Sequence, residues 1–216
     1  ISQEEVFKNI HGVNDLKLRG GWGQTGNQEG VSDFAAYGLL GFSRITPGNV
    51  FIGPGIRRLT IANPELRWEK TTQTNIGFDI TVLENRLTMA ADVYWKKTHG
   101  LIMSIPLPSS VGVEQPFIRN DGELENKGVE FMISSINFKK EKFTWNTDFN
   151  ISFNKNKVSK LGLQKIYDYA KIYSNGQNAI RMTEGQPMGS FYGYISEGVD
   201  PESGNIKYRD LDGNGI

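Results

Sequence analysis

The end of the chain carries oxygen-bearing side chains at the spacing of a calcium-binding loop. Asp210, Asp212 and Asn214 alternate with other residues, and Gly215 follows them. This order matches the first half of the EF-hand pattern D-x-[DN]-x-[DN]-G, in which alternate oxygens surround a hard cation and the glycine makes the bend. The distal bidentate Glu of that pattern would lie beyond Ile216. Asx-turns explain the same residues equally well, so a calcium site and a plain turn are both open interpretations.

Three aspartates, Asp79, Asp92 and Asp148, are the carboxylates that a glycoside hydrolase would need as acid and base. Each lies in a separate predicted strand, and none belongs to a diagnostic catalytic motif. We therefore expect these three aspartates to be hydrated residues of a sheet surface and not catalytic residues. The histidines, His11 and His99, are far apart and cysteine is absent, so the sequence predicts neither a zinc site nor a disulfide framework.

Aromatic residues in the predicted loops are the candidate ligand contacts. Their rings can stack on sugar rings or pack against neighbouring loops, and loop packing is the ordinary role. The residues concerned are Phe51, Phe117, Tyr192 and Tyr194.

The segment from Thr71 to Thr98 predicts the elements that would position these residues. Apolar and polar residues alternate strictly through Val82, and the alternation resumes after the polar turn Leu83 to Arg86. A period of two indicates strands, not a helix. Each arm sustains the pattern for about 9 to 11 residues or more, which suits a tilted strand crossing a bilayer better than a soluble strand of about 5 to 6.

The remaining strands are predicted by the same alternation. We expect strands at about 15–24, 67–83, 86–98, 124–138 and 143–157, and long loops at 25–66, 99–123 and 158–216. A β-bulge at Ser134–Ser135 is expected to return Ile136 and Phe138 to the apolar face. Within the last loop, Leu161 to Tyr173 has some helical character, which Gly162 weakens.

Composition narrows the functional classes. The 24 Lys and Arg residues balance 24 Asp and Glu residues, so nothing points to nucleic acid. No run of about 18 apolar residues predicts a transmembrane helix, but barrel strands leave only a weak hydropathy signal. The chain begins at Ile1 and ends inside the Asp/Asn/Gly motif, so we interpret it as a piece of a longer protein.

Two architectures fit the alternation: a transmembrane barrel wall and a soluble β-sandwich. Strand length, short turns alternating with long loops, and aromatic residues near both strand ends favour the barrel. The apolar face also carries no charge within the predicted spans, whereas Asp79, Asp92, Glu130 and Asp148 point the other way. We expect an all-β antiparallel meander forming part of a large transmembrane β-barrel with long extracellular loops. A secreted β-sandwich that binds carbohydrate is the alternative.

Several motifs together resemble the SusC/RagA-type TonB-linked outer membrane proteins. The motifs run in the family's order across nearly the whole chain. They are LKLRGGWGQTGN (16–27), NPELRWEKTTQTNIGFDI (63–80), NRLTMAADVYWKKT (85–98), ELENKGVEFMI (123–133), WNTDFNISFNKNKV (145–158) and GSFYGY (189–194).

The resemblance implies a plugged barrel of about 22 strands, of which residues 1–216 look like part of the C-terminal half, without the plug domain. It also implies a location in the outer membrane of a Gram-negative bacterium, in contact with its lipid. The implied partners are a SusD-like surface lipoprotein, the TonB–ExbB–ExbD energy-coupling complex and a glycan or peptide ligand, with no cofactor other than the calcium considered above.

Overall fold

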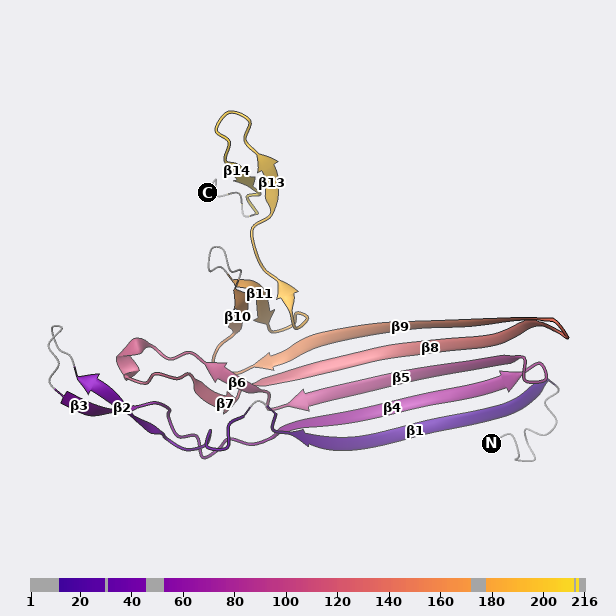
Figure 1. The fold of residues 1–216 in the computed structure, drawn as a ribbon, viewed down its shortest axis with the longest axis horizontal. Coiled ribbons are helices and arrows are strands. Elements are labelled where there is room, and N and C mark those ends of the chain that lie inside the picture. Colours follow the sequence, from indigo (N-terminus) through magenta and orange to yellow (C-terminus); the bar gives the residue numbers. More distant parts are fainter. Residues whose placement is uncertain (1–11, 30, 46–52, 172–177, 212, 214–216) are drawn as a thin grey trace.

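A single five-stranded antiparallel sheet dominates the structure (Figure 1). The structure is a computed structural model that describes residues 12–29, 31–45, 53–171, 178–211 and 213. Each strand pairs with the next one in the order β1-β4-β5-β8-β9, so the predicted antiparallel meander is confirmed. The strands are β1 (Val13–Asn27), β4 (Glu69–Val82), β5 (Leu87–His99), β8 (Gly122–Lys140) and β9 (Phe143–Leu161).

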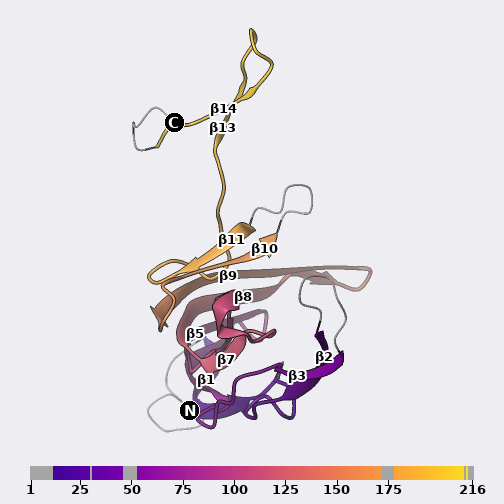
Figure 2. The same cartoon turned by 90° about the vertical axis from the view of Figure 1, so that its left-hand side faces the viewer.

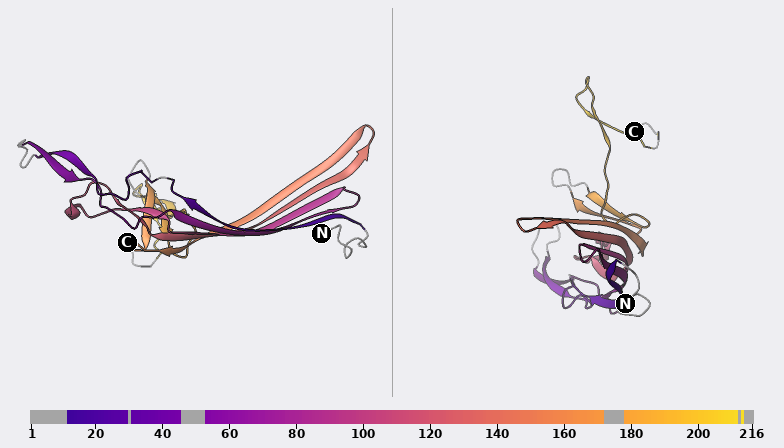
Figure 3. Two further views of the ribbon diagram at one scale, coloured as in Figure 1. Left: turned by 90° about the horizontal axis from the view of Figure 1, so that it is seen from below. Right: turned by 90° about the vertical axis from the view of Figure 1, so that its right-hand side faces the viewer.

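The sheet is curved, and its two ends differ. Seen end-on, the strands form an open trough with a convex and a concave side (Figure 2). Short turns join β4 to β5 and β8 to β9 at one end of the sheet, here called the turn end. The long connections gather at the other end, the loop end (Figures 1 and 3). Among the described residues, no helix is both long and apolar enough to cross a bilayer.

The convex face carries the apolar residues of the alternating pattern. Cross-strand partners form continuous rows over all five strands, and nothing in the described chain covers them: Phe153, Phe149 and Val129 are 66%, 52% and 45% exposed. A β-sandwich would bury this face beneath a second sheet, so that alternative is wrong. The rows are Leu16–Ile80–Met89–Ile133–Phe149, Leu18–Phe78–Ala91–Phe131–Ile151 and Gly20–Ile76–Val93–Val129–Phe153.

The predicted bulge in β8 exists, but it lies two residues further along. The register with β9 shifts between Ile136 and Phe138, not at Ser134–Ser135, so Asn137 is the extra residue. Phe138 consequently faces Trp145 on the convex side, whereas Ile136 stays on the concave side. The Asn137 amide donates a 2.6 Å hydrogen bond to a threonine hydroxyl of β9. A polar side chain that bonds across the ladder can occupy an unpaired bulge position, and this preference selects Asn137.

The turn from β4 to β5 contains left-handed backbone at residues that are not glycine. Leu83, Glu84 and Asn85 have φ values of 57°, 54° and 64°, which costs a residue with a Cβ roughly 1 kcal/mol or more. We expect Glu84→Gly to raise the free energy of unfolding of the full-length parent protein by about 0.5 to 1 kcal/mol, since glycine relieves this strain at some entropic cost. Urea unfolding measures the change, and Arg86→Gly is the control in the same turn. A Glu84→Gly protein no more stable than the parent would contradict the strained turn.

The predicted long loops contain strands of their own, so their description as loops alone is wrong. Short hairpins formed there because residues with local turn signals pair with near neighbours in sequence. The additional strands are β2 (Leu40–Ile45), β3 (Gly53–Arg58), β6 (Ile102–Ile105), β7 (Phe117–Asn120), β10 (Ile166–Lys171), β11 (Asn178–Thr183), β12 (Ser190–Phe191), β13 (Ser196–Val199) and β14 (Ile206–Tyr208), with a 3-10 turn at Ser109–Val111.

The helical interpretation of Leu161 to Tyr173 is also wrong over its described part. β9 continues to Leu161, and β10 occupies Ile166–Lys171 and pairs with β11. Gly162 follows β9 directly and lies against a buried carboxylate: a Cβ there would meet Asp121 Oδ1 at 1.7 Å. A helix starting at this point would lose both the close approach and the pairing with β11.

A small apolar core forms at the loop end. The core joins β6, the loop end of β9, β10 and β11. It therefore packs the hairpins of the loop end against the five-stranded sheet. Its members are Met103, Ile105, Val158, Leu161, Tyr167 and Met182, with Leu101, Phe117 and Leu124 against them.

Candidate functional site

Arg19 of β1 joins two aspartates of neighbouring strands on the concave face. Its Nη2 atom donates hydrogen bonds to Asp79 Oδ1 at 2.9 Å and to Asp92 Oδ2 at 2.8 Å. The three side chains remain 29% to 38% exposed, so they are hydrated. Gly77 makes this approach possible, because a Cβ at that position would lie 2.1 Å from Asp92 Oδ1.

A cavity of about 610 Å³ with both polar and apolar lining opens beside this triad. Glu130 of β8 lies directly across from Asp92 in the register, so the concave face places two acids opposite each other next to the Arg19 guanidinium. The concave-face residues that line the cavity are Lys17, Arg19, Asp79, Ala90, Asp92, Glu130, Met132, Asn150 and Ser152. Charged and amide groups in this arrangement suit hydration and contact with a polar solute or polypeptide.

The structure brings two of the three predicted carboxylates together. Asp79 and Asp92 share Arg19, whereas Asp148 accepts a hydrogen bond from Ser134 Oγ elsewhere on the concave face. Since both members of the pair accept from the same cation, neither is placed as a proton donor. Sequence reasoning missed Arg19 itself, because the connection between β1 and β4 is long and no short turn fixes their register.

Asp121 is a buried carboxylate at the loop end that sequence reasoning also missed. Its side chain is 2% exposed. Arg119 Nε lies 3.3 Å from Oδ1, and Oδ2 accepts from the Leu163 amide at 2.9 Å and the Tyr167 hydroxyl at 3.1 Å. A buried charge is stable only when its acceptor positions are filled, so these bonds tie β10 to the β6–β7 hairpin.

Asn120, the residue before it, ties the same hairpin to the start of β4. Its Oδ1 accepts from the Arg67 amide at 2.8 Å, and its Nδ2 donates to the Arg67 carbonyl at 2.7 Å and the Gly100 carbonyl at 2.8 Å. The Asn120 side chain thus makes the hydrogen bonds to Arg67 that the backbone of a neighbouring strand would otherwise make. The only signal in the sequence was the turn-type run Asn120-Asp121-Gly122, which shows a turn but not its partners.

The Tyr167 hydroxyl predicts a stability change at alkaline pH. Burial, and then the hydrogen bond to Asp121, raise the pKa of Tyr167 from 10.0 to about 12. This contribution to stability is fully present below pH 10 and is lost as pH rises towards 12, because the unfolded state releases the proton first. We expect the melting temperature of the full-length parent to exceed that of its Tyr167→Phe variant by an amount that is constant below pH 10 and shrinks as pH rises from 10 towards 12.

Tyrosinate absorbance at 295 nm gives the direct measurement. The parent-minus-Tyr167→Phe difference should titrate near pH 12, and Asp121→Asn should lower that midpoint, because the negative charge that opposes ionisation is removed. A midpoint near 10 in the parent would show that this hydroxyl is not buried against Asp121.

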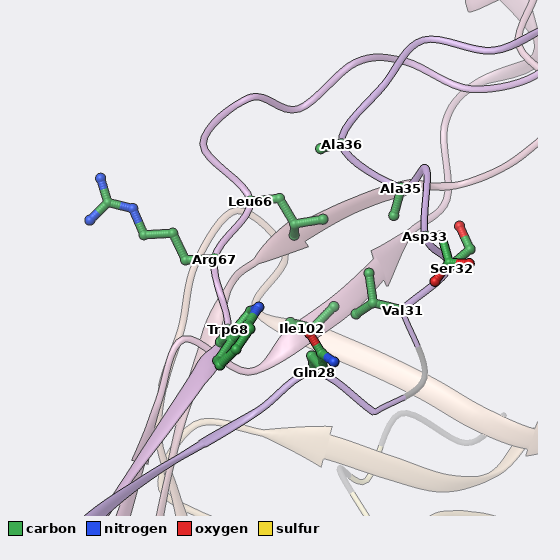
Figure 4. A pocket seen from close by; sticks show the side chains of 10 residues that line it. All are labelled: Gln28, Val31, Ser32, Asp33, Ala35, Ala36, Leu66, Arg67, Trp68 and Ile102. Atoms are coloured by element: carbon green, nitrogen blue, oxygen red, sulfur yellow. The ribbon is translucent and has the colours of Figure 1, made fainter.

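A second cavity, of about 330 Å³, lies between Gln28, residues 31–36 and the segment before β4 (Figure 4). Trp68 and Ile102 lie at one side of it and Ala35 at the other, while the Arg67 side chain extends away. The indole is 62% exposed and lies over Gly26, where a Cβ would meet its Cε3 atom at 2.9 Å. This cavity therefore presents an exposed aromatic surface.

The candidate aromatic residues mostly contact the protein itself. Phe117 packs against the core at the loop end. Tyr192 lies under the Arg181 guanidinium, 3.3 Å from its ring centroid, and Asp168, which holds Arg181 from the other side, has its pKa lowered by that hydrogen bond. Tyr194 packs on a tyrosine ring of β14 at 5.1 Å. Phe51 lies outside the described residues. A ligand-stacking role for these residues stays a prediction.

The candidate metal ligands are only partly described. Asp210 Oδ1 accepts a 2.7 Å hydrogen bond from the Gly213 amide, three residues on, a local bond of the kind that aspartates make in turns. Asp212 and Asn214 lie outside the described residues, as does His11. His99 Nδ1 lies 3.5 Å from a Glu123 carboxylate oxygen. Within the described part of the chain, no group of three or more His, Cys, Asp or Glu residues is arranged to hold a metal. Calcium binding stays a prediction that calorimetry on a chain extended past Ile216 would test.

Comparison with known proteins shows the family to which the chain belongs. Residues 11–211 match the family described as TonB dependent receptor-like, beta-barrel. Over its whole length the chain is 34% identical to TonB-dependent receptor P3 of Formosa agariphila and 32% identical to TonB-dependent receptor SusC of Bacteroides thetaiotaomicron, and it covers 23% and 22% of those proteins.

Solved structures show the same fold. The chain resembles the RagAB peptide transporter with a TM-score of 0.77 at 23% identity, over 94% of this chain and 21% of that one. The sequence thus spans about a fifth to a quarter of the length of its relatives. The chain belongs to the TonB-dependent receptor family of β-barrel transporters in the Gram-negative outer membrane.

Proposed function

We propose that the chain forms part of the wall and the extracellular mouth of an importer that takes up oligosaccharides or peptides. The observation that carries this proposal is the division of one sheet into two faces. The convex face is apolar and uncovered over three continuous rows, whereas the concave face holds the Arg19–Asp79–Asp92 triad and a hydrated cavity. Lipid suits the first face and an aqueous passage suits the second.

We infer the partners from the similarity of the chain to its relatives. The chain is similar to TonB-dependent receptor SusC and to the RagAB peptide transporter. They support a SusD-like surface lipoprotein over the loop end, energy supply through TonB–ExbB–ExbD, and a glycan or peptide as cargo. The plug domain and the remaining strands would belong to the rest of the parent protein. The family consists of transporters and not enzymes, which agrees with the expectation that this chain has no catalytic residues.

Uptake by cells that carry or lack the parent gene tests the proposal. Labelled oligosaccharides and oligopeptides of increasing length are offered separately, and import is followed with and without a protonophore, because TonB coupling depends on the proton-motive force. We expect at least one cargo class to require both the gene and the proton-motive force. Uptake of every cargo unchanged by deletion, or recovery of the parent protein in the soluble fraction without detergent, would overturn it.

A further inference from the structure

Four lysines follow the apolar rows on the convex face, at the side nearest the loop end. The next row of cross-strand partners is Trp22–Thr74–Trp95–Lys127–Lys155, and the row after it contains Lys97, Glu125 and Lys157. We call Lys97, Lys127, Lys155 and Lys157 the lysine band. Partners in one row have Cβ atoms about 4.5 to 5.5 Å apart, and successive rows on one face are about 7 Å apart. The four ammonium groups thus lie within reach of a single headgroup.

The lysine band has more positive charge than its neighbours neutralise. Lys97 lies 3.1 Å from Glu123, and Lys127 lies 3.9 Å from Glu125. Within the described residues, Lys155 and Lys157 have no ion-pair partner, and both are exposed. Four lysines against two glutamates leave a net charge of +2. Like charges this close repel unless an anion lies among them.

The place of the lysine band relative to the apolar rows indicates which anion that is. Phe153 and Val129 lie one row below Lys155 and Lys127 in the same two strands, on the exposed apolar face that the proposed function assigns to lipid. Trp22 and Trp95 mark the boundary, where indole rings lie at headgroup level. A lipid whose acyl chains cover Phe153 therefore has its headgroup at the lysine band, and lysine stems extend towards such an interface with their charge in water.

We propose that the lysine band binds phosphate groups of lipid headgroups in the outward-facing leaflet of the membrane. The site lies on the lipid side of the wall and is independent of the concave cavity and of cargo. Each lysine near an anionic surface contributes about fivefold to affinity. Removing the two unpaired lysines should weaken binding roughly 30-fold.

Native mass spectrometry of the full-length transporter in detergent tests this inference. The probes are dilauroyl phosphatidylglycerol, which is anionic, dilauroyl phosphatidylcholine, which carries the same phosphate without net charge, and inorganic phosphate. The variants are Lys155→Gln/Lys157→Gln and, as matched control, Lys17→Gln/Lys96→Gln, which removes two lysines from the concave face. Lys155→Arg/Lys157→Arg keeps the charge and should retain binding.

We expect phosphatidylglycerol to bind the parent and the concave-face control alike, more tightly than phosphatidylcholine, and to bind Lys155→Gln/Lys157→Gln roughly 30-fold more weakly. Equal binding to both double variants would overturn the inference. So would displacement of the bound lipid by millimolar inorganic phosphate, because the site would then be one for free phosphate and not for a lipid headgroup.

Discussion

Valine in place of Gly128 is expected to lower the free energy of unfolding of the full-length barrel by about 3 kcal/mol, near the upper end of the usual range for overpacking. A Cβ at Gly128 would lie 2.6 Å from the Tyr94 hydroxyl oxygen and 2.7 Å from the backbone carbonyl oxygen of Phe153. The tyrosine can rotate away. The carbonyl belongs to the ladder between β8 and β9, so it can move only if cross-strand hydrogen bonds lengthen.

Gly23→Val is the matched control. Gly23 lies on the concave face of β1, and nothing lies within 4 Å of the position where its Cβ would be. Urea unfolding in detergent, followed by tryptophan fluorescence, compares the two variants. A double variant, Tyr94→Ala with Gly128→Val, should recover only part of the loss, because the Phe153 carbonyl remains. Equal stability of Gly128→Val and Gly23→Val would show that the backbone contact is not close in the assembled barrel.

The wall was predictable because its pattern is local. Strand β4 was expected at 67–83 and runs over Glu69–Val82, and its alternation alone assigns Phe78 to the apolar face and Asp79 to the other. The tight turn after Val82 then fixes the pairing with β5. Side-chain direction in a strand needs no knowledge of distant residues, which is why a single sequence suffices for it.

The loop end was not predictable for the opposite reason. Asp121 is stabilised by Leu163 and Tyr167, which are 42 and 46 residues away. Nothing in the local sequence distinguishes such a carboxylate from an exposed turn residue. Prolines between β6 and β7 excluded a central strand, as expected, but they permit the separate β6–β7 hairpin.

The concave site was predictable in part. Asp79 and Asp92 were expected to share a face, and the β4–β5 register places Asp92 against Gly77, two residues from Asp79. The contribution of Arg19 depended on the register between β1 and β4, which a connection of about forty residues leaves undefined. Long loops join neighbouring strands at little entropic cost, but they specify no register.

Arginine at Phe131 is expected to destabilise the membrane-inserted barrel by about 2 to 4 kcal/mol, whereas arginine at the next residue, Met132, should cost much less. Phe131 lies in the middle apolar row of the convex face, between Ala91 and Ile151. Lipid hydrocarbon there would leave the guanidinium without water. Met132 points to the concave cavity, beside Asn150 and Ser152, where the same group stays hydrated.

Comparing Phe131→Arg with Met132→Arg separates the effect of the surroundings of the side chain from the other effects of the substitution. Both variants add the same charge to the same strand one residue apart, so changes in strand propensity and net charge nearly cancel in the comparison. Folding into lipid vesicles, followed by denaturant unfolding, gives the two free energies. Should Phe131→Arg be tolerated as well as Met132→Arg, water or protein must cover the convex face instead of lipid. The assignment of outside and inside would then be lost, and with it both the proposed passage along the concave face and the lysine band's place at the headgroups.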